Sequence, residues 1–169
     1  MNINNKKSNY NKKINNIAGK LLPSAIDSVH KSVYKSIFIS LSKTLKKSEE
    51  TFSSMVIRKI KENGMSDVAC YKAANLNRQI FSKIRSSAGE KENDSYQPNK
   101  NTALSLAIAL KLSIDESYEL LKKAGFTFSK SNKTDIIVEY CIKNNINDIT
   151  MVNEILFYYG QPILGSKSS

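Results

Sequence analysis

The sequence predicts an all-α fold. Apolar residues recur at steps of three and four through most of the chain, which is the spacing of one helix face, and no segment shows sustained strand alternation. Residues that cap or end helices separate these segments, among them Asn63-Gly64, Ser113 and Gly125. With 169 residues, 40% of them hydrophobic, the chain is long enough for one domain with a core and an extension.

The first part of the chain predicts a polar tail followed by one long helix. Residues 1–22 are rich in Asn and Lys and offer little to bury, so we expect a disordered basic tail. Residues 23–48 carry a thin apolar stripe from Ile26 to Leu45, which predicts an amphipathic helix. A lone helix of this kind is only marginally stable in water, so we expect it to dock on its own domain, a second copy or a partner.

Residues 49–125 predict a domain that contains a helix-turn-helix. Ser66 or Asp67 can cap a short first helix. Asn75 tolerates a left-handed backbone and so suits a tight turn, after which Asn77 can cap the second helix. A C-terminal helical extension over residues 126–165 and a short tail follow. The other elements that we expect are a loop and four helices, at residues 87–99, 101–112, 113–125, 134–144 and 149–158.

The charge of +11 is confined to the first hundred residues. Residues 1–50 contain ten Lys and three acidic residues, whereas residues 101–169 contain seven basic and seven acidic residues. This asymmetry indicates a polyanionic partner, either nucleic acid or an acidic protein surface. A bias toward Lys and Asn in a low-GC genome would explain many Lys residues, but it does not predict a neutral C-terminal half.

Other classes of protein receive little support from the sequence. The chain lacks a Gly-rich phosphate loop, a cluster of metal ligands and a Ser/His/Asp constellation, so we expect no enzymatic activity, no cofactor and no metal. Cys70 and Cys141 lie far apart within apolar patterns and predict buried, reduced thiols, and the lone His30 predicts a surface residue. No apolar run approaches the length of a membrane span, and we expect a cytoplasmic protein without a membrane partner.

The second helix of the helix-turn-helix, residues 77–86, predicts a DNA-reading surface. Its apolar residues can face the core while Arg78, Gln79, Ser82 and Lys83 face outward. Arg and Lys can bond guanine and Gln can bond adenine in the major groove, so we expect these four side chains to contact bases. The alternative is an ordinary solvated helix face.

The segments "MSDVACYKAANLNRQIFSKIRS" and "PNKNTALSLAIALKLSIDESYELLKKAG" resemble the Xre/Cro/cI repressor superfamily over about residues 52–125. The resemblance implies a Cro/cI-like five-helix domain with residues 77–86 as the recognition helix. It also implies phosphate contacts at a helix start, and the basic tail could follow the phosphate backbone as a flexible arm. The phosphate contacts that we expect are Asn77, Arg85, Lys100, Asn101, Thr102, Lys12 and Lys13. Residues 50–165 also resemble a helical module at the end of some bacterial macro-domain proteins.

These observations predict a sequence-specific regulator of transcription, such as a repressor, of phage or mobile-element type. Its partner is double-stranded DNA, and we expect a homodimer that associates through the stripe Ile26–Leu45 or through the apolar helix at residues 149–158. The alternative is a protein-interaction module that binds an acidic surface as an inhibitor or accessory factor in a phage-defence system. RNA binding through the basic tail is a third reading.

Overall fold

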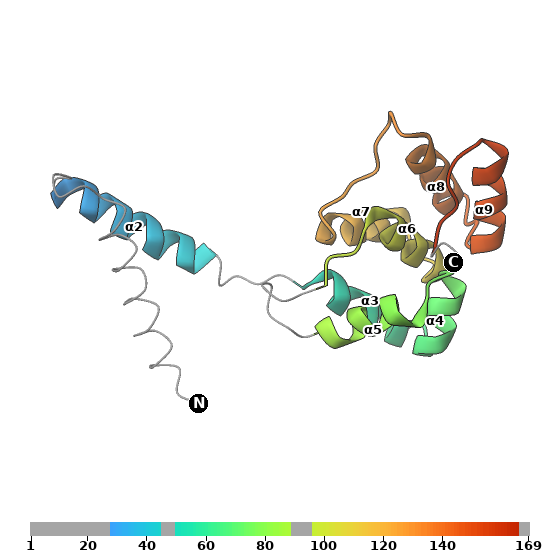
Figure 1. Ribbon diagram of the computed structural model, residues 1–169, viewed down its shortest axis with the longest axis horizontal. Helices are drawn as coiled ribbons and strands as arrows, with labels where there is room; N and C mark the ends of the chain where they lie inside the picture. Colours follow the sequence, from blue (N-terminus) through green and yellow to red (C-terminus); the bar gives the residue numbers. More distant parts are fainter. Residues whose placement is uncertain (1–27, 45–49, 89–95, 166–169) are drawn as a thin grey trace. The chain divides into compact units, whose positions relative to one another are not determined.

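The computed structural model describes residues 28–44, 50–88 and 96–165, and all regular structure in these ranges is α-helical (Figure 1). This confirms the predicted all-α class. The described helices are α2 (Ser28–Thr44), α3 (Phe52–Glu62), α4 (Asp67–Ala73), α5 (Arg78–Ser87), α6 (Lys100–Ala109), α7 (Ile114–Lys123), α8 (Lys133–Lys143) and α9 (Ile149–Tyr158). The predicted basic tail and most of the predicted loop after α5 lie outside the described residues.

The chain divides into two compact units, residues 1–47 and 48–169. The first unit contains α2, a helix without acidic residues whose described side chains, from Ser32 to Thr44, are all exposed. The described part of its apolar stripe is included, since Val33, Ile37 and Leu41 are each about half exposed. Within the described ranges, no helix is both long enough and apolar enough to cross a membrane.

Helix α6 lies at the centre of the second unit and contacts α4, α7 and α9. Every side chain from Thr102 to Ala109 is buried, as expected for a helix that is apolar all round. The polar Ser105 is satisfied because its hydroxyl donates to the Asn101 carbonyl. Helix α3 contacts α5 and α7, and α8 contacts α7 and α9, so the C-terminal helices share one core with the earlier ones.

Six helices of this unit end in the same kind of turn. A residue with positive φ follows each helix, and the next residue donates its N–H to the carbonyl five positions earlier, at 2.8–3.1 Å, which is the pattern of a Schellman motif. The turn predicted at Asn75 is confirmed, with φ of 52°. At Lys111 (φ of 50°) this turn ends α6 at Ala109, three residues before the predicted end of the helix. In these six turns the residues with positive φ are Gly64, Asn75, Lys111, Gly125, Asn145 and Gly160.

Two buried acids anchor α8 to its surroundings. Asp135 forms an ion pair with Lys100 and accepts the Ser129 N–H at 2.7 Å. Glu139 accepts from Lys130 at 2.7 Å, from Lys143 at 2.8 Å and from the Tyr118 hydroxyl at 3.0 Å. The ammonium groups of Lys130 and Lys143 lower the pKa of Glu139 to about 2. These acids therefore serve the fold.

Candidate nucleic-acid interface

The turn between α4 and α5 consists of four residues, Ala74 to Asn77, and both helices that it joins are capped. Ser66 caps α4 by accepting the Ala69 N–H at 3.1 Å. Asn77 caps α5 by accepting the Ile80 N–H at 2.8 Å. A short turn with caps on both helices fixes the direction in which α5 leaves α4.

The buried side of α5 determines which of its residues face solvent. Leu76, Phe81 and Ile84 are 6%, 4% and 0% exposed and belong to the core. The Phe81 ring also contacts the half-buried ring of Tyr71 in α4, with centroids 5.9 Å apart. Because these contacts hold one face of α5 inward, the opposite face is presented to solvent.

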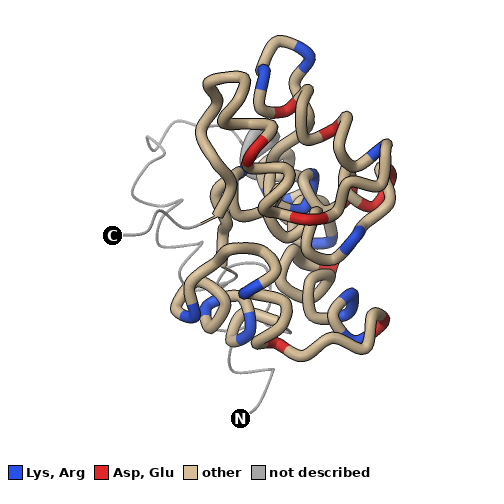
Figure 2. Tube along the Cα trace, turned by 90° about the vertical axis from the view of Figure 1, so that its right-hand side faces the viewer, with Lys and Arg blue, Asp and Glu red and all other residues tan. Residues whose placement is uncertain are grey.

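That opposite face carries the four residues for which the sequence predicts base contacts. Arg78, Gln79, Ser82 and Lys83 are all exposed, and none of their side chains forms a hydrogen bond or ion pair with another described residue. The structure thus brings the four together on one helix with their side chains exposed. Figure 2 marks the Lys and Arg positions along the chain in blue and the Asp and Glu positions in red. The arrangement can donate hydrogen bonds to an external acceptor such as a base edge or a phosphate.

Arg85, for which we expected a phosphate contact, differs from its neighbours in having an acidic partner. Its Nε lies 3.5 Å from a carboxylate oxygen of Asp67 in α4. Both side chains are well exposed, at 55% and 40%, so water screens this pair. Asp67 is the one acidic residue of α4 and α5, so the two helices together keep a net positive charge.

The phosphate contacts predicted at the start of α6 are engaged inside the protein. Lys100 pairs with the buried Asp135, and Thr102 is only 2% exposed. The Asn101 side chain donates to the Ile163 carbonyl at 3.0 Å and accepts the Gly165 N–H at 2.7 Å. Of the remaining predicted contacts, Asn77 caps α5, while Lys12 and Lys13 lie outside the described residues.

The segment that bonds to the Asn101 side chain could not be predicted from the sequence. The segment Ile163–Gly165 returns to the α4–α5 turn, where the Asn75 side chain donates to the Leu164 carbonyl at 3.1 Å. Asn153 of α9 donates to the same carbonyl at 3.1 Å and accepts the Leu164 N–H at 2.7 Å. Gly160 and Pro162 indicate only that α9 ends, and no local pattern predicts where the chain goes afterward.

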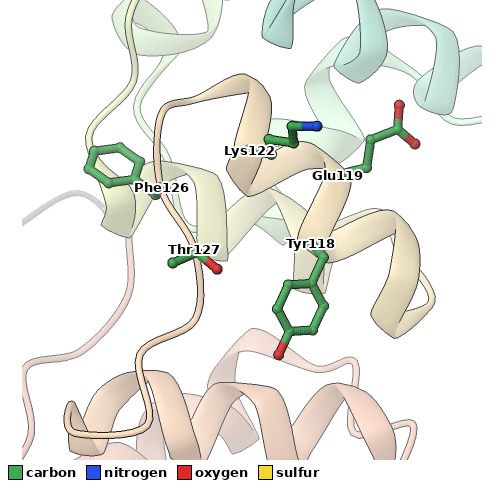
Figure 3. Close-up of a pocket in the computed structure, with 5 residues that line it drawn as sticks. All are labelled: Tyr118, Glu119, Lys122, Phe126 and Thr127. Atoms are coloured by element: carbon green, nitrogen blue, oxygen red, sulfur yellow. The ribbon is translucent and has the colours of Figure 1, made fainter.

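An open pocket of about 380 Å³ lies beside α7 (Figure 3). Its lining includes Tyr118 and Phe126, whose rings flank Thr127 in the view. The Tyr118 hydroxyl is bonded to Glu139, and Glu119 lies 3.3 Å from Lys123, so these two polar side chains of the lining already have partners. Nothing in this lining resembles a nucleophile with a positioned base.

The described residues contain no group of three or more His, Cys, Asp or Glu side chains arranged to hold a metal ion. Both cysteines are buried, and burial raises the pKa of the Cys70 thiol to about 12. Cys70 therefore behaves as a small core residue, and the same reasoning applies to Cys141, whose pKa is also raised by burial.

No protein-family model, no curated protein and no solved structure matches the chain.

Proposed function

We propose that this protein binds double-stranded DNA in a sequence-specific manner and regulates transcription. In this proposal α3–α7 act as a Cro/cI-like five-helix domain and α5 enters the major groove. The observation that carries the proposal is that Arg78, Gln79 and Lys83 lie together on the solvent face of the second helix, with no acidic partner among the described residues. Donors placed in this way suit guanine and adenine edges.

Phosphate contacts would provide most of the affinity, in keeping with the net charge of +11. Arg85 can contribute because its pair with Asp67 is long and exposed. Asn101 would have to act through its backbone N–H group, since its side chain is bonded internally. Thr102 is not offered as a phosphate contact, because its side chain is buried and its backbone N–H already donates to Asn99 Oδ1 at 2.8 Å. A helix-turn-helix monomer contacts few base pairs, so we expect two copies on adjacent half-sites.

The proposal is tested by selecting sequences from a pool of random duplexes with the purified protein, followed by titration at two salt concentrations. We expect enrichment of one motif and binding at least about a hundredfold tighter to it than to a scrambled duplex, because specific sites usually exceed nonspecific ones by ~10³ or more. Arg78→Ala should reduce this ratio, whereas Arg58→Ala, which alters an ion-paired cation of α3, should not. Equal binding to all duplexes that disappears at high salt would refute sequence reading.

A protein partner is the second candidate function, and the surface of α9 favours it. Phe157 and Tyr158 are 78% and 82% exposed, which is unusual for large aromatic side chains. Leu156, in the same helix for which we expected a dimer surface, is fully buried and belongs to the core. If this protein enriches no duplex but is captured by an acidic protein from the same genome, the result supports a protein partner over DNA.

A further inference from the structure

The segment Ile163–Gly165, which we call the C-terminal latch, connects three separate parts of the fold. Its main chain bonds with side chains from the α4–α5 turn, from α6 and from α9, namely Asn75, Asn101 and Asn153. Each of these amides can donate through nitrogen and accept through oxygen, so together they suit the polar groups of a short peptide. Five hydrogen bonds of 2.7–3.1 Å result.

The latch also contributes an apolar anchor. Leu164 is 1% exposed and is part of the same core cluster as Leu76 and Ile84, the residues on which the turn and α5 rest. Burial of a leucine combined with hydrogen bonds on both sides gives a segment with one defined position. Residues that follow the last helix of a domain are usually poorly ordered unless such contacts hold them.

Gly165 brings the latch into direct contact with the turn. Its φ is +101°, a conformation that residues with a side chain rarely adopt. A Cβ at this position would lie 2.6 Å from Nδ2 and 2.8 Å from Cβ of Asn75, and closer still to the Asn75 backbone oxygen. The glycine therefore allows two backbones to approach where any larger residue would push the turn away.

We propose that the C-terminal latch positions the α4–α5 turn and thereby sets the orientation of α5. The turn has its own Schellman bonds, but these fix only its local shape. The helix caps of α4 and α5 do not reach α6 or α9. The latch bonds to Asn101 of α6 and to Asn153 of α9, and so it connects the turn to both helices. Gly165, Leu164 and Asn153 are thus positioning residues, distant in sequence from the side chains that would meet DNA.

The consequence for DNA rests on the proposed function. Because base contacts require side chains to be placed to within a fraction of an ångström, loss of the latch should weaken binding to the preferred duplex more than binding to a scrambled one. A merely destabilising change would lower the active fraction and so affect both duplexes equally.

The test uses the full chain and hydrogen exchange resolved at single amides by NMR. Gly165→Ala is the perturbing variant, and Gly160→Ala is its matched control, since Gly160 also has positive φ (+65°) but no atom within 4 Å of an added Cβ. Asn153→Ala is a second perturbing variant without backbone strain, which removes the two bonds of its side chain to Leu164.

In the unchanged protein we expect the amides of Leu164 and Gly165 to be protected from exchange. Gly165→Ala and Asn153→Ala should accelerate exchange there and at Asn75 and Leu76 by about tenfold or more, the change expected from losing one or two hydrogen bonds. The amide of Ile146, in the turn after α8, should keep its rate, and Gly160→Ala should leave the α4–α5 turn unchanged.

Unprotected Leu164 and Gly165 amides in the unchanged protein, or uniform acceleration throughout the variants, would overturn the latch. Its coupling to recognition is measured separately, as the ratio of affinities for preferred and scrambled duplexes in Gly165→Ala and Gly160→Ala. A ratio that falls only in Gly165→Ala supports the coupling, and a ratio retained in both refutes it. If the unchanged protein prefers no duplex, the proposed function fails while the exchange rates still decide the latch.

Discussion

Helices α3 and α5 contact each other and each carries three basic residues, yet they differ in how many of these residues form ion pairs. In α3, Arg58 bonds to Glu50 and Glu62, and Lys59 bonds to Glu62 and to Glu116 of α7. In α5, only Arg85 has an acidic partner among the described residues. Both helices contain three basic residues, but acidic partners bind two of them in α3 and only one in α5, so more of the positive charge of α5 is available to a partner.

This difference teaches that a count of Lys and Arg does not locate a binding surface. The ion pairs of α3 join it to α7 and to the residues before it, and so they belong to the fold. The exposed face of α5 has no comparable function inside the protein. The predictions below separate these roles, beginning with the buried side on which α5 depends.

The largest effect is expected from Ile84→Ala. Ile84 lies on the inner face of α5 and is fully buried. Truncation of such a side chain leaves a cavity, so the free energy of unfolding should fall by about 2–5 kcal/mol. Urea denaturation measures this change. Val68→Ala on α4 is the control, since Val68 is half exposed and should cost less than about 1 kcal/mol. Equal losses in both variants would contradict the assignment of the inward face of α5.

The next largest effect concerns recognition. Arg78→Ala should reduce discrimination between the preferred and a scrambled duplex by about 1–3 kcal/mol while leaving the free energy of unfolding nearly unchanged, because Arg78 has no partner among the described residues. Fluorescence anisotropy with both duplexes measures the ratio. Lys61→Ala, an exposed cation of α3, is the control and should affect both duplexes alike. An unchanged ratio in Arg78→Ala would remove α5 from base recognition.

For α3 the expectation is reversed. Arg58→Ala should lower the free energy of unfolding by about 1 kcal/mol, since Arg58 binds two glutamates at 2.7–3.0 Å but remains partly exposed. Its duplex affinity ratio should stay constant. Thermal or urea unfolding together with the anisotropy assay gives both values, and a loss of the ratio in Arg58→Ala would erase the distinction between the two helices.

The smallest effect, about 0.5 kcal/mol at neutral pH, is expected from Glu116→Gln. Lys59 and the Ser113 N–H lower the pKa of Glu116 to about 2, below its unfolded value of about 4.3. The stabilisation is therefore complete above the unfolded pKa and disappears as pH falls toward 2. Urea unfolding at several pH values should give a flatter acid profile for Glu116→Gln, with a residual slope from Glu139, whose pKa is also about 2. A profile identical to that of the unchanged protein would exclude Glu116 as a source of the dependence.

Much of the fold could be predicted because its signals are local. Asn63-Gly64 ends α3, Ser113 caps α7 in a capping box, and α9 spans the predicted residues 149–158. The end of α6 was wrong because Lys111 occupies a left-handed position where Gly or Asn is usual, and because apolar residues continue past the turn. The α5 face followed from periodicity alone, since its buried residues recur at helical spacing.

The internal engagement of Lys100 and Asn101 could not be predicted from the sequence. Their partners, Asp135 and the C-terminal latch, lie 35 and 62–64 residues away and leave no periodic pattern near α6. A helix start with Lys, Asn and Thr is typical of an anion site and equally of a well-bonded junction inside a protein. Only the arrangement of the whole chain distinguishes these cases.

The latch has a consequence for the order in which the protein is made. Its bonds to Asn101 and Asn75 span up to 89 residues, so a nascent chain that has completed α3–α7 can already pack α4 against α6 but still lacks the hydrogen bonds of the latch. Synthesis proceeds at about 5–20 residues per second, and a further stretch of chain must clear the ribosome before Leu164 can reach its seat. For an interval of seconds, the α4–α5 turn and α5 can form while the hydrogen bonds of the latch are still missing.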